Sequence, residues 1–406
     1  MEYDIDIQKV KEKVFANKEL IANEIKKIIS IKSYSGDEKE VVDYLVSRMK
    51  EYNFDEFKND SLGSAIGRIG NGKLKIMYDA HIDTVHVTES EDWEYPPFEG
   101  KIVDGKIYGR GAVDEKPAMA GYLIAGKIIK ELFKDEELPF TLYTVGSCLE
   151  EDVDGFPLMH IMEKENIVPD FVVLGEPTDM TVFRGQRGRM EIKVTTHGKS
   201  AHGAHNSKGI NAIYKMTKII SEIEKLDKEL PIKEPLGKGS ITVSNIISNA
   251  PSMCSVPDRS QIHIDRRMTV GENEESVINE LKEIAKKVNV EADVNVPVYS
   301  GKGWTGYEFT NKAYFPTWYF DEDHAIVKSG LEAASIALEK EAKSSFWSFS
   351  TNGVATAGTK GIPTIGFAPG DESLAHSSKE FIVLEDLYKA VVFYVLFPFI
   401  LTKNLK

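Results

Sequence analysis

Hydrophobic and polar residues follow helical spacing in some segments of the chain and short strand-like runs in others. In the first fifty residues, apolar positions predict two amphipathic helices, around 21–29 and 41–49, separated by a Ser/Gly break at 33–36. Short apolar runs and longer helical stretches then alternate. The expected strands are 65–69, 74–78, 106–108, 140–145 and 171–174, and the expected helices are 118–133 and 158–163. Strands that alternate with helices predict a largely parallel sheet covered by helices.

The pattern changes after about residue 187 and resumes from about residue 323. Between them we expect a compact α+β insert and then a Gly- and aromatic-rich return linker at 301–319. The insert's expected strands are 190–196, 240–247, 261–265 and 290–297, and its helices are 210–226 and 275–288. A helix to 338, a strand at 364–367 and a last helix from 384 follow. The fold class is therefore α/β: a helix-covered, mostly parallel sheet domain (1–187 and 301–406) split by an inserted α+β domain (188–300).

Composition and charge narrow the choice of partners. The 406 residues include 50 Lys and Arg against 64 Asp and Glu, a net charge of −14. An acidic surface repels phosphate backbones, so we expect no nucleic-acid partner. The two cysteines, Cys148 and Cys254, exclude a disulfide scaffold and a Cys-rich metal site. The N-terminus shows no apolar signal segment, and the longest apolar run, 390–401, is shorter than the ~20 residues that span a bilayer. We expect a cytoplasmic protein with no membrane partner.

A histidine and an aspartate follow the apolar strand at 74–78. Polar groups at the carboxyl end of such a strand lie where open α/β sheets place their sites. Because side chains two residues apart point the same way, Asp83 can accept the second ring N–H of His81, as in carboxylate–histidine–metal arrangements. A His-Asp pair in a surface turn would explain this motif equally well by itself.

Carboxylates mark the next two expected strand ends. Asp114 lies in a glycine-containing turn before a helix, where its two oxygens can bridge two metals, or where it complements the helix dipole. Glu150 and Glu151 follow the strand at 140–145. Adjacent carboxylates repel unless a cation or a proton lies between them, so one serves as ligand and the other as base, unless the loop is simply solvated.

Two further strand ends complete the set. Glu176 follows the strand at 171–174, and His376 follows the strand at 364–367. Five strand ends thus deliver His, Asp, Glu, Glu and His in turn, and their coincidence in one sheet is not explained by five separate surface loops. Mixed His and carboxylate ligation without thiols predicts a di-zinc or similar hydrolytic site.

These residues, in this order, resemble the M20 family of metallopeptidases, which includes aminoacylases, acetylornithine and succinyl-diaminopimelate deacylases and glutamate-type carboxypeptidases. The resemblance covers nearly the whole chain and is strongest to the selenium-metabolism-linked hydrolases. It implies two divalent metal ions per chain, with zinc favoured and cobalt or manganese as alternatives. It also implies hydrolysis of the amide bond of an N-acyl amino acid, or alternatively a dipeptidase or carboxypeptidase acting on short peptides.

The resemblance assigns a role to each motif residue. Glu150 is the general base, and Asp83 holds His81 in place. Asp114 is the ligand shared by both metals. The metal ligands are His81, Asp114, Glu151, Glu176 and His376.

The insert resembles the family's lid, which implies a homodimer formed through this domain. His202 matches the lid histidine that stabilises the tetrahedral intermediate, although His205 is a close competitor, and in many members this histidine comes from the partner subunit. Arg267 matches an arginine that binds a substrate carboxylate, and its planar fork suits that role; a structural surface arginine is the alternative. Asn352 and Gly370 are assigned as further substrate contacts.

Several positions depart from the family pattern. Pro117 and Ala118 replace the usual Gly-Gly, Cys254 replaces a substrate-binding Asn, and Asn352 lies where others read Gly-Thr-Asp. Every metal-binding position matches the family pattern, so we expect metal-dependent hydrolysis. The departures lie at substrate positions and leave the particular substrate open. The alternative to an enzyme is a non-catalytic, dimeric binding module with the same fold. The Gly-x-Gly-x-x-Gly match at 301–306 is not followed by a helical pattern, so we expect no nucleotide site there.

Overall fold

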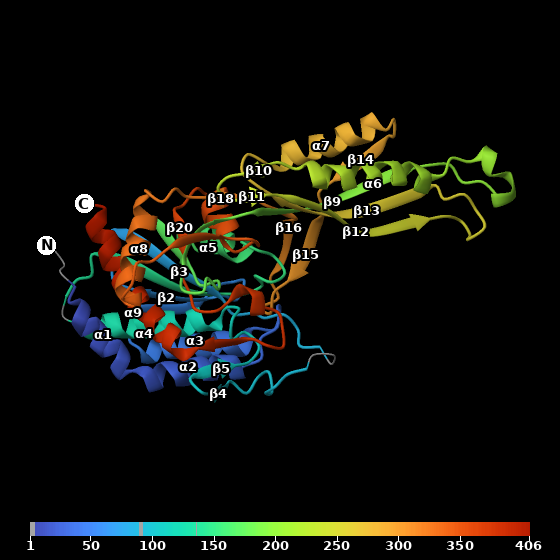
Figure 1. Cartoon of the computed structure of the whole chain (residues 1–406). Coiled ribbons are helices and arrows are strands. Elements are labelled where there is room, and N and C mark those ends of the chain that lie inside the picture. Colours follow the sequence, from blue (N-terminus) through green and yellow to red (C-terminus); the bar gives the residue numbers. More distant parts are fainter. Residues whose placement is uncertain (1–4, 89–91, 135) are drawn as a thin grey trace.

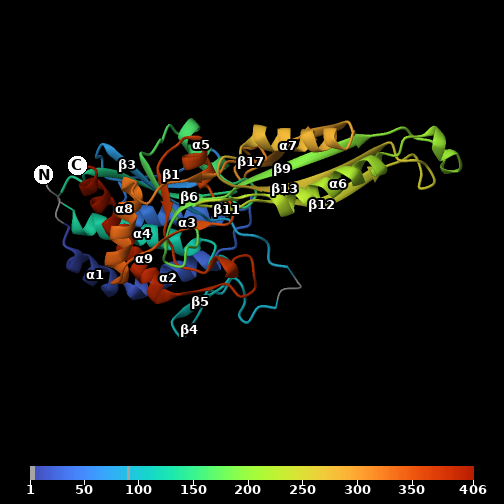
Figure 2. The same cartoon turned by 45° about the horizontal axis from the view of Figure 1, so that its top comes forward.

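The computed structural model describes residues 5–88, 92–134 and 136–406. Two large sheets organise these residues, and each has a hydrophobic core of its own. Figure 1 shows a rounded larger domain from which a long arm projects, built from the middle of the chain. The turned view in Figure 2 shows the same separation, so the arm stands clear of the larger domain along most of its length.

The larger sheet carries the predicted alternation of strands and helices. Its nine described strands run in the order β1-β2-β6-β3-β7-β20-β8-β18, with β19 beside β8. Strands β6, β3, β7 and β20 are parallel, so their carboxyl ends meet at one edge, and the expected mostly parallel sheet is confirmed. The strands are β1 (Glu56–Asn59), β2 (Ala65–Ile69), β3 (Leu74–His81), β6 (Phe140–Ser147), β7 (Phe171–Leu174), β8 (Val182–Gln186), β18 (Trp318–Tyr319), β19 (Ser344–Trp347) and β20 (Thr364–Gly366).

One face of this sheet carries a thick layer of helices. There α4 and the C-terminal α9 pack together, with α1, α2, α3 and α8 around them (Figure 1). The apolar run at 390–401 forms the buried part of α9, as predicted. The opposite face carries α5 and the short turn η2. The bounds are α1 (Ile7–Ala16), α2 (Lys18–Ser30), α3 (Lys39–Glu51), α4 (Lys116–Leu132), α5 (Phe156–Lys164), α8 (Ala325–Leu338), η2 (Val354–Thr359) and α9 (Leu384–Asn404).

The arm has an antiparallel sheet in the order β12-β13-β9-β14, with β17 beside β9. Two helices, α6 and α7, cover one face of this sheet and bury its apolar side chains, as the pattern of the insert predicts. The other face carries the polar members of each strand's alternation, among them Arg189 and Arg267. The bounds are β9 (Gly188–His197), η1 (Gly203–Lys208), α6 (Ala212–Glu229), β12 (Ser240–Asn249), β13 (Arg259–Met268), α7 (Glu274–Lys287), β14 (Ala292–Asn295) and β17 (Tyr314–Phe315).

The structure differs from the sequence-based expectation in several places, among them the unexpected strands β1, β8 and β19 of the larger sheet. The N-terminal helix α1 was not expected, because only Val10 and Val14 are buried in it, and two positions are too few to show a helical period. The segment 301–319 is not a plain linker. It contributes to the hairpin of β15 (Val298–Lys302) and β16 (Glu308–Lys312) and then to β17 and β18, which join the arm's sheet and the larger sheet respectively.

Short strands complete the fold. They are β4 (Lys101–Val103), β5 (Lys106–Tyr108) and β21 (Phe381–Val383) in one small sheet, and β10 (Ile232–Lys233) and β11 (Gly237–Lys238) in another, while η3 (Glu372–Leu374) is a single helical turn. Within the described ranges, no helix has both the length and the apolar character needed to cross a membrane.

Candidate metal centre and active site

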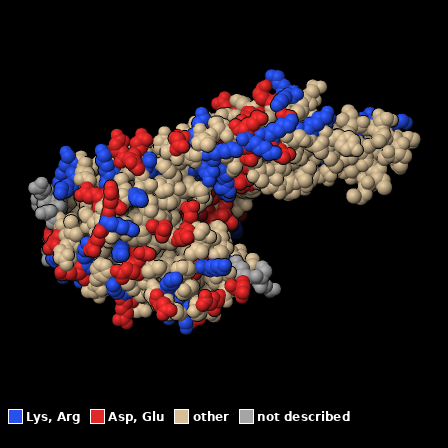
Figure 3. Space-filling model, viewed as in Figure 1, with Lys and Arg blue, Asp and Glu red and all other residues tan. Residues whose placement is uncertain are grey.

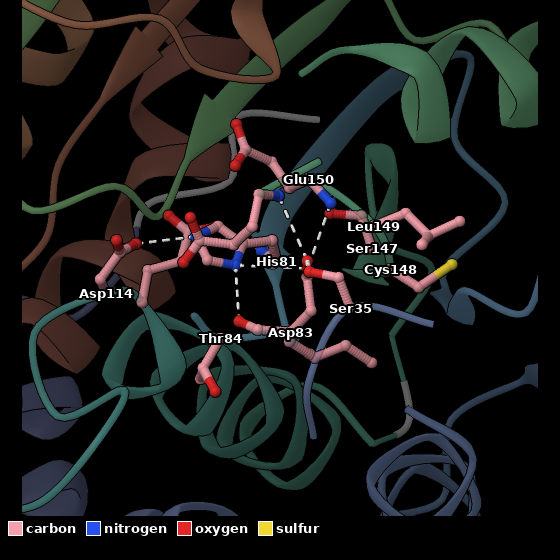
Figure 4. A network of polar contacts seen from close by, with 12 residues as sticks. Ser35, His81, Asp83, Thr84, Asp114, Ser147, Cys148, Leu149 and Glu150 are labelled. Atoms are coloured by element: carbon pink, nitrogen blue, oxygen red, sulfur yellow. Dashed lines mark hydrogen bonds and ion pairs between the residues drawn. The ribbon is translucent and has the colours of Figure 1, made fainter. Parts of the chain in front are cut away.

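His81 ends the central strand β3 and is buried at the carboxyl edge of the larger sheet. Its Nε2 lies 2.7 Å from Oδ1 of Asp114, which comes from the turn before α4 (Figure 4). Its Nδ1 lies 3.0 Å from the backbone oxygen of Asp83 and 3.5 Å from that residue's Oδ1. Asp83 therefore fixes the ring mainly through its backbone carbonyl, which leaves Nε2 to face a metal.

The carboxylate of Asp83 binds the backbone of the loop that follows β6. Its two oxygens accept the backbone N–H groups of Glu150 and Glu151 at 3.1 and 3.2 Å, and they also accept the hydroxyl of Ser35 at 2.6 Å (Figure 4). Because each of these contacts joins the loop or the 33–36 break to β3, the position of Glu150 depends on Asp83.

A second buried carboxylate supports the same loop. Glu38 accepts the backbone N–H of Leu149 at 3.1 Å, and Leu149 adopts a left-handed conformation with a φ of 65°. Burial, and then the nearby charge of Asp83, raise the pKa of Glu38 to about 7. Sequence reasoning missed Glu38 and Ser35, for which the break in helical pattern at 33–36 was the available signal.

Asp114 lies between two histidines. Its Oδ1 faces His81, and its Oδ2 lies 2.9 Å from Nε2 of His376, which is also 3.1 Å from Oε2 of Glu151. The ligand atoms of His81, Asp114 and Glu151 all lie within 4.8 Å of one another, as do those of His81, Glu115 and Glu176. A carboxylate whose two oxygens face two imidazoles, with further carboxylates on either side, fits the donor set of two neighbouring divalent ions.

Glu150 is a buried carboxylate whose Oε1 has no hydrogen-bond partner among the described residues. Burial, and then the charges of Asp154 and Glu176, raise its pKa well above its usual value. The pKa of Glu176 is raised for the same reason, burial first and then the neighbouring carboxylates. Hydrogen bonds to Asp114 and Glu151 raise the pKa of His376 to about 10. Crowded carboxylates of this kind are stabilised by protonation or by positive charge, and bound metal ions would supply the positive charge.

A cavity of about 320 Å³ opens beside these groups, between the larger domain and the base of the arm. Figure 3 shows this hollow, with acidic atoms at its floor. Arg267 reaches it from β13, so the structure brings this predicted substrate contact to the metal-site residues. The lining residues are Asp114, Glu150, Glu151, Asp154, Glu176, Arg189, Arg267, Phe349, Ser350, Glu372, Ala375 and His376.

Five expected site residues lie outside the lining of this cavity: His81 and Asp83, whose contacts are given above, and His202, Asn352 and Gly370. His202 and His205 lie at the turn η1, the green tip of the arm farthest from the larger domain (Figure 1). Asn352 is buried, and its Nδ2 donates to Asp79 at 2.9 Å and to Ser147 at 3.0 Å, so its amide braces the ends of β3 and β6. Gly370 has a φ of 109°, in the region that favours glycine, and its carbonyl accepts the N–H of Asp179.

Four further charged residues at the site were not expected from the sequence. Glu115 directly follows Asp114, is buried, and accepts the backbone N–H of His81. Asp154, Arg189 and Glu372 line the cavity. Asp154 follows the Glu pair by three residues, which was a usable signal, whereas Arg189 and Glu372 reach the cavity from segments without a motif.

A helix-covered parallel sheet with His and carboxylate ligands at its carboxyl edge defines a metal-dependent hydrolase. Residues 77–398 match Peptidase family M20/M25/M40, and the chain belongs to this family. The uncharacterized protein YgeY of Escherichia coli (strain K12) is 42% identical over 356 residues, which is 88% of either chain. A probable succinyl-diaminopimelate desuccinylase of Staphylococcus epidermidis is 23% identical over 396 residues, 90% of this chain and 93% of the relative. The expected membership of the M20 family is confirmed.

The fold agrees with solved structures of the same family. The YXEP protein of Bacillus subtilis, a dinuclear metal-binding peptidase of the M20 family, aligns with a TM-score of 0.69 at 14% identity, and the match covers 95% of this chain and 98% of that one. At this identity the comparison shows the fold. Together with the ligand cluster, it supports a family site for two metals, whose identity the donor set does not select.

Proposed function

We propose that the protein is a dinuclear metal-dependent amidohydrolase that removes the acyl group from an N-acyl amino acid. The observation that carries this proposal is the position of Glu150. Its buried carboxylate has an oxygen without a partner in the described structure, and it lines the same cavity as Asp114, which lies between His81 and His376. A proton acceptor placed beside a two-metal donor set is the arrangement that hydrolysis of an unactivated amide requires.

The metal ligands are those of the family motifs. His81, Asp114 and Glu176 would hold one ion, and Asp114, Glu151 and His376, which contact one another in the structure, would hold the other. Zinc is the expected metal, with cobalt or manganese as alternatives. When bound, the ions polarise the scissile carbonyl and make water acidic enough to attack at neutral pH.

The protein's own residues move the proton and hold the substrate. Glu150 accepts a proton from the attacking water and passes it to the nitrogen of the leaving amino acid, because its carboxylate lines the cavity beside the metal ligands. Asp83 keeps the Glu150 loop and His81 in register. Arg267 binds the carboxylate of the amino acid. Asn352 acts from behind the cavity wall, through the ends of β3 and β6 that its amide joins, and Gly370 acts through its carbonyl, which holds the segment at Asp179.

His202 serves the cavity of a second copy. It lies at the arm's tip, so we propose a homodimer formed through the arm, which acts as a lid domain spanning residues 188–300. The arm offers surface for this contact, because Ile246 and Ile247 on the edge strand β12 and Tyr214 on α6 are exposed apolar side chains. We further propose that this dimer works in the cytoplasm.

Glu372 favours a second candidate, a dipeptidase or carboxypeptidase that acts on short peptides. Its carboxylate lines the cavity, and its buried Oε2 has no partner among the described residues. A free α-amino group of a peptide would satisfy this oxygen, whereas the blocked nitrogen of an N-acyl amino acid carries no such charge.

One experiment sorts these functions. Metal-free protein is loaded with zinc, cobalt or manganese and offered a panel of N-acyl amino acids and dipeptides, with the products read by mass spectrometry and Glu150→Gln as the blank. Release of an amino acid from the acyl compounds by the wild type alone supports the deacylase, and release from dipeptides supports the peptidase. No release from any compound, despite about two bound metals per chain, would leave an amide substrate outside the panel or a non-catalytic binding module.

A further inference from the structure

Two arginines stand opposite each other on the open face of the arm's sheet. Arg189 on β9 and Arg267 on β13 are directly paired residues of neighbouring antiparallel strands. Their chain neighbours Met190 and Arg266 are buried, so the two arginines share the face that carries no helix. Opposed side chains of this kind have Cβ atoms about 4.5–5.5 Å apart, where like charges destabilise a sheet. The pair therefore needs counter-charges, and within the protein Asp154 and Asp265 each supply one.

The hydrogen bonds in the structure use only some of the N–H donors of each guanidinium group. Arg189 donates from Nη2 to Oδ1 of Asp154 at 2.9 Å, and its buried Nε has no partner in the described structure. Arg267 donates from Nε to Oδ2 of Asp265 at 3.0 Å, and among the described residues no acceptor is found for its two terminal nitrogens. Since each guanidinium carries five N–H donors, most donors of the pair remain open to a ligand.

Both arginines line the metal-site cavity, so such a ligand is the substrate. The guanidinium of Arg189 lies over the ring of Phe315, 4.4 Å from the centroid, and together with Asp154 this contact fixes its plane. Two oriented forks on one cavity wall match two carboxylates, because each fork binds one carboxylate through two parallel hydrogen bonds.

We propose that Arg189 and Arg267 form a subsite for two carboxylates of one substrate, so that the enzyme prefers dianionic N-acyl amino acids. This inference rests on the proposed function and narrows its substrate class. Arg267 takes the carboxylate of the amino acid. Arg189 takes a second carboxylate, which the substrate carries on its acyl chain or on its side chain.

The test measures binding in the Glu150→Gln protein loaded with metal, by calorimetry, so that the readout does not depend on turnover. Two matched pairs of ligands differ only in the second carboxylate: N-succinyl-L-alanine against N-butyryl-L-alanine, and N-acetyl-L-glutamate against N-acetyl-L-glutamine. Arg189→Gln is added to this background. Lys193→Gln is the matched control, because Lys193 belongs to the same face of β9 but lies outside the cavity lining.

We expect the dianionic member of at least one pair to bind roughly 10- to 100-fold more tightly. Arg189→Gln should reduce that preference to about 3-fold or less while it leaves the affinity of the monoanionic member nearly unchanged, and Lys193→Gln should preserve the preference. Equal affinities within both pairs, no measurable binding of any of the four compounds, or an equal loss for both members on Arg189→Gln would overturn the proposal. Absence of hydrolysis by the wild-type protein, with the binding preference intact, would count against the proposed function alone.

Discussion

The carboxyl edge of the larger sheet and the arm contribute to one cavity in different ways. At the sheet edge, His81, Asp83 and Glu150 are buried and are held by contacts to one another and to the loop backbone. On the arm, Arg267 is partly exposed, and His202 lies at the far tip. Under the proposed function, metal binding and proton transfer depend on the larger domain alone, whereas substrate selection and the oxyanion contact depend on the arm, of this chain or of a second copy.

The largest expected effect comes from a substitution at the carboxyl edge of the larger sheet. Glu150→Gln removes the proton acceptor, so we expect kcat to fall by about 10³-fold while both metals stay bound, because Glu150 is not in the ligand set. Amino-acid release measured by mass spectrometry, together with the metal content of the variant, checks this. Asp152→Asn is the matched control, since Asp152 is exposed and lies outside the cavity lining. Activity retained in Glu150→Gln would remove Glu150 from its role as base.

The second-largest expected effect comes from substitution of His202 at the tip of the arm. His202→Ala should lower kcat by roughly 10²-fold through loss of oxyanion stabilisation, with an unchanged metal content. If the histidine acts in a second copy, mixing His202→Ala with Glu150→Gln should restore part of the activity, because mixed dimers contain one intact site. His205→Ala is the control and should retain activity. No recovery on mixing, in a preparation shown to exchange subunits, would contradict action across the dimer.

A smaller effect concerns the pH dependence of stability, through Glu38. Its pKa is raised to about 7 in the folded protein by burial, from an ordinary value of 4.5. The folded state therefore favours the protonated form, and this contribution is fully present below pH 4.5 and is lost as the pH rises through 7. Between pH 5 and pH 8 we expect the wild type to lose roughly 1–2 kcal/mol more of its unfolding free energy than Glu38→Gln loses. Urea unfolding at both pH values measures the difference, and parallel curves for the two proteins would refute it.

The smallest expected effect concerns the support of Asp83. Ser35→Ala removes a hydroxyl that donates to Asp83 at 2.6 Å, so the loop of Glu150 loses one constraint. We expect kcat to fall about 5-fold, as for the loss of about 1 kcal/mol, with little change in KM. Ser30→Ala, at an exposed helix end where the hydroxyl donates to the carbonyl of Lys27, is the control and should behave as the wild type. An equal change in both variants would show that Ser35 does not act through Asp83.

The same comparison explains which residues the sequence could reveal. His81, Asp114 and Glu176 each follow an expected strand or open an expected helix, and the ends of parallel strands meet at one edge, so local patterns were enough to bring them together. Ser35 contacts Asp83 across 48 positions, and Arg189 contacts Asp154 across 35. No local period records contacts of this kind, because they arise from tertiary packing.

The segment 301–319 shows the same limit for the fold. Its glycines and aromatic residues are typical of a loop, yet Tyr314 and Phe315 pair with β9 and Trp318 pairs with β8. These pairings depend on the strands that the segment meets and not on its own alternation, so a pattern of hydrophobic positions could not show them.

Counting the metals bound per chain tests the central claim most directly. The claim is that the larger domain alone holds a two-metal site centred on Asp114. Elemental analysis of loaded protein should give about two metals per chain in the wild type and in His202→Ala, and clearly fewer in Asp114→Asn, because both sites share this carboxylate. One metal or none in the wild type, or two metals retained in Asp114→Asn, would contradict it.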